Sequence, residues 1–275
     1  MNLRKETEFL LEKYKLKANK NLGQNFLISE EIISEIVNVA NVTSEDVVIE
    51  IGPGLGSLTS KLADVAKKVI AIELDDNMIM VLKERFSLYK NVELIHADVL
   101  KTDLQQIIST NGKVKVVANL PYYITTPIVM KLLEEKLDIE SITVMVQKEV
   151  GERFCANPGN KDYGAITVSI NYYSTPNIVI NVPKENFNPV PEVDSCVVKL
   201  DVKKEHIKLK NEKNFFKVIK AAFSQRRKNI GNSLTAIGKS KNEIKEMLEE
   251  LNIDINSRAE NLSIEQYAII ADYIS

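Results

Sequence analysis

The first residues that could do chemistry are three closely spaced glycines. Gly52, Gly54 and Gly56 follow the apolar run Val47-Val48-Ile49 and precede apolar residues at helical spacing. A strand, a glycine-rich turn and a helix in this order bring backbone amides close to a ligand, because a Cβ would block the approach. By itself the pattern fits an ordinary tight turn as well as a nucleotide-like ligand.

Acidic and amide side chains end the next apolar runs. Glu73 follows the run 68–72 and lies about 20 residues after Gly52, where a carboxylate can accept both hydroxyls of a ribose. Asp98 closely follows the run 92–95, and Asn119 follows 114–118. Because the carboxyl ends of parallel strands meet at one edge of a sheet, we expect these side chains to share one crevice.

The segment Asn119-Leu120-Pro121-Tyr122 has the groups needed to hold an aromatic amine. The Asn119 amide oxygen and the Leu120 carbonyl are hydrogen-bond acceptors, and Tyr122 offers a ring for stacking. Two acceptors that pull on the protons of an exocyclic amine favour a tetrahedral nitrogen, whose localised lone pair can attack a methyl donor. Positioning and electrostatics would supply most of the acceleration. The alternative is a structural Asn-Pro turn beside a core tyrosine.

The elements that must position these residues follow an α/β pattern and then an all-helical one. Ser29 is expected to cap a helix through Val39, and Thr126 to cap a helix with Pro127 at its first position. We therefore predict a doubly wound domain over residues 1–202 and a helical domain over 203–275. The expected strands are 47–49, 68–72, 92–95, 114–118, 142–146, 166–173 and 193–200, and the later helices are 215–223, 241–251 and 264–274.

Charge is distributed unevenly along the chain. The net charge is only −2, but the segment from Lys203 to Lys241 contains twelve Lys or Arg and two acids, a local net of +10. Such asymmetry indicates a surface that faces a polyanion, although a solvated helix face is the alternative.

Several classes of protein are disfavoured by what the chain contains. Two separate cysteines, Cys155 and Cys196, and two distant histidines argue against a disulfide framework, a zinc site or a Ser/His relay. No apolar run approaches the ~18 residues of a membrane span. The charged stretch from Met1 to Lys20 lacks the apolar middle of a signal peptide, so we expect a cytoplasmic protein with no membrane partner.

Taken in order, these motifs resemble the ribosomal RNA adenine dimethyltransferases, most closely the bacterial branch that acts on 16S ribosomal RNA. The resemblance runs from about residue 15 to the end. The motifs that carry it are Gln24-Asn25-Phe26-Leu27, Glu50 to Gly56, Glu73-Leu74-Asp75, Ala97-Asp98, Asn119 to Tyr122, Phe187 to Ser195, Phe223 to Lys228 and Arg258 to Ser263.

The resemblance implies a Rossmann-like class I methyltransferase, with a seven-stranded, mostly parallel sheet, followed by a small helical RNA-binding domain. Its cofactor would be S-adenosyl-L-methionine. Its substrate would be two adjacent adenosines in a 3′-terminal hairpin of 16S rRNA, within a precursor of the small ribosomal subunit, and the protein is expected to be a monomer. The segment 1–28 would lie on the side of the cofactor and the RNA.

The resemblance also implies a role for each motif residue. Cofactor binding would involve Asn25, Leu27, Gly52, Gly54, Glu73, Asp98 and Asn119. Catalysis would involve Asn119, Leu120, Pro121, Tyr122 and Phe187, with Tyr122 and Phe187 stacking on an adenine that has left its own stack. RNA binding would involve Arg226, Arg227 and Lys228.

Two positions depart from the pattern of these enzymes. Gly231 stands where they usually have a basic residue, and Glu192 where they usually have lysine, so two phosphate contacts are in doubt. Two other functions remain open: a methyltransferase of the macrolide-resistance type that acts on 23S rRNA, and a ribosome assembly factor whose main role is binding.

Overall fold

The computed structural model describes residues 2–18, 23–225 and 227–275, and it divides into two compact units. Unit 1 comprises Met1–Gly151 and Thr175–Val202, and unit 2 comprises Glu152–Ser174 and Lys203–Ser275. The segment Glu152–Ser174, which the sequence placed in the first domain, is thus part of the second compact unit.

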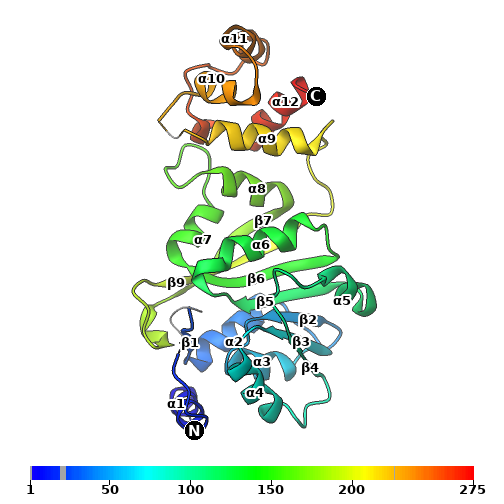
Figure 1. Cartoon of the computed structure of the whole chain (residues 1–275), viewed down its shortest axis with the longest axis vertical. Helices are drawn as coiled ribbons and strands as arrows, with labels where there is room; N and C mark the ends of the chain where they lie inside the picture. Colours follow the sequence, from blue (N-terminus) through cyan, green and yellow to red (C-terminus); the bar gives the residue numbers. More distant parts are fainter. Residues whose placement is uncertain (1, 19–22, 226) are drawn as a thin grey trace. The chain divides into compact units, whose positions relative to one another are not determined.

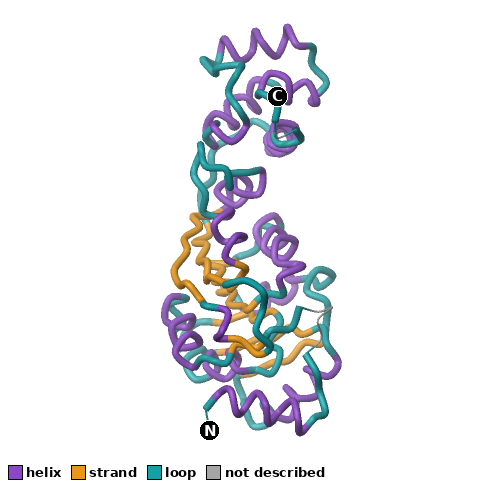
Figure 2. Tube along the Cα trace, turned by 90° about the vertical axis from the view of Figure 1, so that its left-hand side faces the viewer, coloured by secondary structure: helices purple, strands orange, loops and turns teal. Residues whose placement is uncertain are grey.

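Unit 1 is built on a seven-stranded, mostly parallel sheet with flanking helices, as expected (Figures 1 and 2). The strand order is β4-β3-β2-β5-β6-β9-β7. The five strands from β4 to β6 pair in parallel, and β9 is antiparallel to β6. The bounds are β2 (Val47–Ile51), β3 (Lys68–Glu73), β4 (Val92–His96), β5 (Val114–Asn119), β6 (Ile139–Gln147), β7 (Ser174–Val182) and β9 (Ser195–Val202).

The central strands are mostly apolar because helices cover the sheet. Every residue of β2 is buried, and all but the first residue of β3 are buried. The apolar faces of two helices, α2 and α3, pack onto this surface in one core cluster, which includes Ile36 and Leu62 together with Val48 and Val117 of the sheet. The flanking helices are α2 (Glu30–Val39), α3 (Ser57–Ala63), α4 (Asp76–Arg85), α5 (Leu104–Asn111) and α6 (Thr125–Glu134).

Two expectations about local structure were wrong. Residues 165–173 form a helix, α8 (Ala165–Tyr173), and the strand lies in the following segment, β7. Helix α6 begins at Thr125, and its N-cap residue is Ile124 instead of Thr126. A 3₁₀ turn, η2 (Tyr122–Ile124), precedes it, and the Thr125 hydroxyl donates to the Pro121 carbonyl at 3.1 Å. Pro127 still falls in the first turn, where its missing N–H costs little. The expected cap of α2, Ser29, was confirmed.

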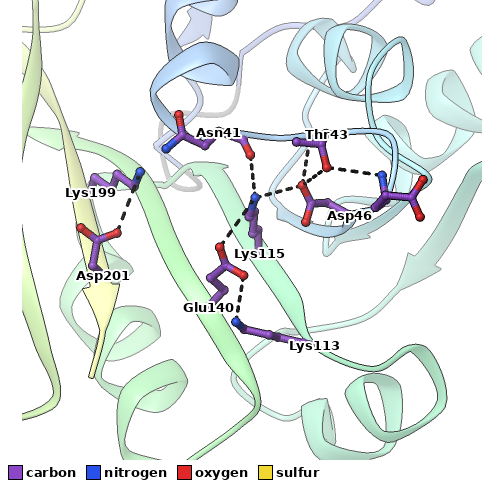
Figure 3. Close-up of polar contacts among 9 residues, drawn as sticks. Asn41, Thr43, Asp46, Lys113, Lys115, Glu140, Lys199 and Asp201 are labelled. Atoms are coloured by element: carbon purple, nitrogen blue, oxygen red, sulfur yellow. Dashed lines mark hydrogen bonds and ion pairs between the residues drawn. The ribbon is translucent and has the colours of Figure 1, made fainter. Parts of the chain in front are cut away.

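A buried lysine joins three elements at the edge of the sheet where the parallel strands begin (Figure 3). The Lys115 ammonium on β5 donates to the Asn41 carbonyl at 2.6 Å and to the Asp46 carboxylate at 2.9 Å. Glu140 on β6 lies 3.8 Å from the same ammonium and pairs with Lys113 at 2.9 Å. The charge on Lys115 is therefore neutralised and hydrogen-bonded, as burial requires.

Two short strands from opposite ends of unit 1 form a separate ladder. β1 (Phe26–Leu27) pairs antiparallel with β8 (Phe187–Asn188), and the amide of Ile28 extends the pairing by donating to the Asn186 carbonyl at 2.8 Å. Upstream, α1 (Leu3–Lys13) is held by ion pairs from Glu6 to Arg85 and from Lys13 to Glu84, both partners lying on α4. The N-terminal segment is thus fixed to the domain at both of its described parts.

Unit 2 is helical, apart from an isolated bridge between Asn229 and Arg258. Capping boxes at Ser240 and Ser263 begin α11 and α12, close to the expected starts of these helices. The Tyr267 hydroxyl donates to the Ala259 carbonyl at 2.6 Å in the buried centre of the unit. Its helices are α8, α9 (Glu212–Ala222), α10 (Ile230–Ser233), α11 (Lys241–Glu250) and α12 (Ile264–Tyr273), while α7 (Lys148–Phe154) crosses the boundary between the units.

Among the described residues, no helix is both long enough and apolar enough to cross a membrane.

Candidate functional site

The glycine turn after β2 forms the floor of a cavity at the carboxyl end of the parallel strands. Gly52 and Gly54 have φ angles of +68° and +58°, which residues other than glycine rarely adopt. A Cβ on Gly52 would lie 3.8 Å from Pro121 Cδ and 3.9 Å from the Asn119 carbonyl. The turn therefore lies directly beside the segment that was expected to hold an amine.

Glu73 stands at the tip of β3 and is tied to the glycine turn. One carboxylate oxygen accepts from the amide of Gly54 at 3.0 Å, and the other accepts from the amides of Leu74 and Asp75 at 2.8 and 2.9 Å. Burial raises the pKa of Glu73, and these three donors offset part of that effect. The carboxylate is thus rigidly placed at the wall of the cavity.

A second acidic residue of the cavity is Glu50, the fourth residue of β2. It is only 1% exposed, and its Oε2 has no hydrogen-bond partner within the described residues. Burial raises the pKa of Glu50 to about 8. An orphaned carboxylate oxygen in a cavity wall suits a cationic or hydrogen-bond-donating ligand, because such a ligand would supply the missing partner.

The segment from Asn119 to Tyr122 lines the same cavity from the tip of β5. The Asn119 side chain donates through Nδ2 to the Asn25 carbonyl at 3.3 Å. The Tyr122 hydroxyl lies 2.7 Å from the Ser195 hydroxyl, which fixes the half-buried ring, and burial raises the pKa of Tyr122. The next residue, Tyr123, lines the cavity and is 53% exposed.

The residues that the sequence singled out fall into three places. Ten of them line the cavity: Asn25, Leu27, Gly52, Gly54, Glu73, Asp98, Asn119, Leu120, Pro121 and Tyr122.

Phe187 is not among the residues that line this cavity. Its side chain is 0% exposed and belongs to a core cluster with Leu27 and Val197. In this structure its ring offers no free face to a ligand.

The basic run lies elsewhere in the chain. Arg227 and Lys228 are exposed residues of unit 2, whereas Arg226 lies outside the described residues.

Sequence reasoning missed some of the cavity wall. Glu50 could have been found, since it is the one charged residue in the otherwise apolar strand Val47–Ile51. Tyr123 follows the motif directly, but nothing in the sequence distinguishes an exposed tyrosine from a core one. The β1–β8 ladder had no detectable signal, because strands of two residues show no periodicity.

Among the described residues, no group of three or more His, Cys, Asp or Glu could hold a metal ion. The polar groups of the cavity include two buried carboxylates, the partly exposed Asp98 and the amide of Asn119. This arrangement suits a ligand with several hydrogen-bond donors.

Comparison with known proteins gives consistent matches over nearly the whole chain. A family model described as ribosomal RNA adenine dimethylase matches residues 15–275. Ribosomal RNA small subunit methyltransferase A of Alkaliphilus metalliredigens is 48% identical over 98% of this chain and 96% of the relative. The protein of that name in Clostridioides difficile is 47% identical over 98% and 95%.

Two solved structures share both the fold and the length. A dimethyladenosine transferase from Plasmodium falciparum has a TM-score of 0.76 at 30% identity, covering 88% of this chain and 94% of the other. The 23S rRNA methyltransferase ErmE has a TM-score of 0.70 at 26% identity, covering 90% and 98%.

Proposed function

This chain belongs to the ribosomal RNA adenine dimethylase family, and on that premise we propose that it dimethylates two adjacent adenosines in a 3′-terminal hairpin of 16S rRNA. It is an S-adenosylmethionine-dependent methyltransferase, and its substrate is ribosomal RNA. The observation that carries the proposal is the closeness of the glycine turn to the Asn119–Pro121 segment, since a Cβ added to Gly52 would be in van der Waals contact with it. A donor bound at the turn and an amine held at Asn119 would be neighbours.

The cavity residues fit this cofactor. Asn25, Leu27, Gly52 and Gly54 would enclose its methionine end, and Glu50 has a buried oxygen without a partner for a cationic group. In further proposed contacts, Glu73 would accept from the ribose hydroxyls and Asp98 from the adenine amine. When bound, the cofactor supplies a methyl group on a positively charged sulfur.

The protein's part in the reaction is to hold and polarise the target amine. Asn119 Oδ1 and the Leu120 carbonyl would accept its two protons, Pro121 would keep the turn rigid, and Tyr122 would stack on the adenine ring. Methylation makes the amine nitrogen cationic, and the nitrogen then loses a proton to solvent. A strong base is not needed before attack, because the proton leaves after the bond has formed.

The second methyl transfer differs from the first in a way that these residues can accommodate. A monomethylated amine has a single proton, so only one of the two acceptors can be used. The ring contact from Tyr122 and the rigid turn at Pro121 act equally in both transfers. We assign Phe187 a supporting role, because its buried ring belongs to the core cluster that includes Leu27 of β1.

RNA binding is proposed for Arg226, Arg227 and Lys228 in unit 2, where exposed positive charge can neutralise phosphates. We propose that the partner is 16S rRNA within a precursor of the small subunit, and that the protein acts as a cytoplasmic monomer. Identities of 47 and 48% to small-subunit enzymes, against 26% to the 23S rRNA enzyme, favour this target over the large subunit.

The proposal is tested by methyl transfer to purified subunits. Small and large subunits that lack the modification are incubated with the pure protein and labelled cofactor, and labelled nucleosides are mapped. We expect dimethyladenosine at two adjacent positions of 16S rRNA, and a loss of roughly 10²–10³ in kcat for Asn119→Ala. Label confined to the large subunit would reject the proposed target. Normal ribosome maturation with Asn119→Ala in cells would indicate that binding is the main role.

A further inference from the structure

The catalytic amide is itself held by the main chain of another segment. Asn119 Nδ2 lies 3.3 Å from the carbonyl oxygen of Asn25, the residue just before β1. A carbonyl oxygen can only accept a hydrogen bond, so the atom of Asn119 that faces it must be the NH₂ group. The other atom, Oδ1, then faces away from Asn25, and it accepts no hydrogen bond from the described part of the chain.

An asparagine amide can be turned over by half a rotation, and only one of the two orientations suits the reaction. With Nδ2 toward Asn25, Oδ1 can accept a proton of the target amine. If the Asn119 amide is turned over, its NH₂ group faces the target amine, so that two donors meet. Its Oδ1 then faces the Asn25 carbonyl oxygen, so that two acceptors meet. We propose that the Asn25 carbonyl is a positioning group that selects the productive orientation of Asn119. This inference rests on the proposed function and adds a main-chain group to it.

The Asn25 carbonyl lies immediately before the β1–β8 ladder. Phe26 pairs with Asn188 and Leu27 with Phe187, and both β1 side chains are at least nine-tenths buried. The Phe26 ring also packs on the glycine turn, where its Cε1 would lie 3.2 Å from a Cβ on Gly54. The segment that lines the cofactor cavity therefore also orients the group that receives the amine.

The test changes the carbonyl and leaves every side chain in place. Phe26 is replaced by its α-hydroxy analogue, phenyllactic acid, so that an ester links residues 25 and 26 and the Asn25 carbonyl becomes a weaker acceptor. The matched control is the α-hydroxy analogue of Ile28, which removes the ladder bond to Asn186 but leaves the Asn25 carbonyl an amide. Both variants lack one backbone N–H.

We expect the ester at residue 26 to lower kcat for small subunits about three- to tenfold, the worth of one hydrogen bond, with KM and cofactor affinity within about twofold. The ester at residue 28 should keep kcat close to that of the unmodified protein. Equal kcat for the residue-26 ester and the unmodified protein, or equal losses in both esters, would overturn the inference.

A second measurement does not depend on catalysis. In NMR spectra the Asn119 side-chain NH₂ should show slowed hydrogen exchange in the unmodified protein and in the residue-28 ester, and faster exchange in the residue-26 ester. If the unmodified protein methylates no subunit, the proposed function fails while this readout still stands. An Asn119 amide that exchanges as fast as a free asparagine would then refute the positioning role by itself.

Discussion

Burial of Glu50 is costly for the free protein. This residue is 1% exposed, and one of its carboxylate oxygens lacks a partner among the described residues. Burial disfavours the charged form and raises the pKa of Glu50 to about 8, whereas an unfolded glutamate titrates near 4.5. Such a residue in the cavity wall is favourable only when a bound ligand supplies the missing hydrogen-bond partner.

Replacing this carboxyl by an amide should change the pH dependence of stability. The folded state holds the Glu50 proton more tightly, so this residue's contribution is full below about pH 4.5 and is lost as pH rises through about 8. We expect cofactor-free Glu50→Gln to exceed the parent protein in unfolding free energy by on the order of 3 kcal/mol at pH 9, and to match it near pH 5.

Urea unfolding at several pH values measures this difference. Glu45→Gln is the matched control, because it makes the same chemical change at an exposed position outside the cavity. A Glu50→Gln profile parallel to that of the parent protein would show that Glu50 is ionised in the folded state throughout.

At the scale of elements, Gly231 explains one departure from the pattern of the related enzymes. Its N–H donates to the Ile255 carbonyl at 3.3 Å, and a Cβ there would lie 2.3 Å from Ile255 Cγ1. Any side chain at position 231 would therefore require Ile255 to shift. The glycine at this position is therefore explained by local packing.

This packing predicts a rescue. Gly231→Ala should destabilise unit 2 by about 1–3 kcal/mol, because the added methyl group overlaps the Ile255 side chain. The double variant with Ile255→Ala should recover part of that loss, whereas Ile255→Ala alone should be destabilising, since Ile255 packs on the glycine. Thermal unfolding of the four proteins gives the coupling energy, and strictly additive effects would contradict the overlap.

The elements themselves show what the sequence could and could not predict. The strands β2 and β3 were predictable because burial on both faces leaves a continuous apolar run between turn residues. Helix α8 was mistaken for a strand, since it is rich in β-branched and aromatic residues and most of its residues are buried. Burial all around a helix removes the polar face that reveals its period.

The candidate site was predictable to the extent that it follows strand tips. Glycines, Glu73, Asp98 and Asn119 converge because β2, β3, β4 and β5 pair in parallel and so end at one edge of the sheet. The Asn25 carbonyl contact could not be predicted, since it depends on a ladder of two-residue strands and on a main-chain atom. Side-chain identity carries no information about such a contact.

At the scale of the whole molecule, Lys115 shows how the start of the sheet is held together (Figure 3). Burial raises the pKa of Asp46, but the hydrogen bonds from Lys115 and Thr43 outweigh it and hold that pKa below its usual value. Lys115→Met should lower the unfolding free energy by about 2 kcal/mol at pH 7. This loss is smaller than that expected for breaking a fully buried ion pair, because Asp46 is partly exposed.

The loss of unfolding free energy in Lys115→Met should be smaller in acid. A carboxylate with a depressed pKa stabilises the fold above its unfolded pKa, and this contribution disappears as pH falls through the folded value. Lys113→Met is the control, since its pair with Glu140 is largely exposed and should contribute less than about 1 kcal/mol. Denaturant titrations at pH 7 and pH 3 measure both effects, and equal losses for the two lysines would contradict the central place of Lys115.

The charge of the second unit gives a prediction about how the molecule binds its substrate. Arg227 and Lys228 are exposed in a loop that is anchored by the Ile230 amide, which donates to the Ser257 carbonyl at 2.7 Å. If each of the two residues neutralises one phosphate, RNA binding releases about one counterion at each. The slope of log K against log[salt] should then be about 1.5–2 smaller in magnitude in the double variant Arg227→Ala/Lys228→Ala. The control is Lys67→Ala/Lys90→Ala in unit 1, which removes the same charge from exposed positions. Filter binding of a 16S rRNA hairpin from low to high salt distinguishes the outcomes. A diffuse attraction from overall charge would lower both slopes equally, and only a defined contact surface would lower the first alone.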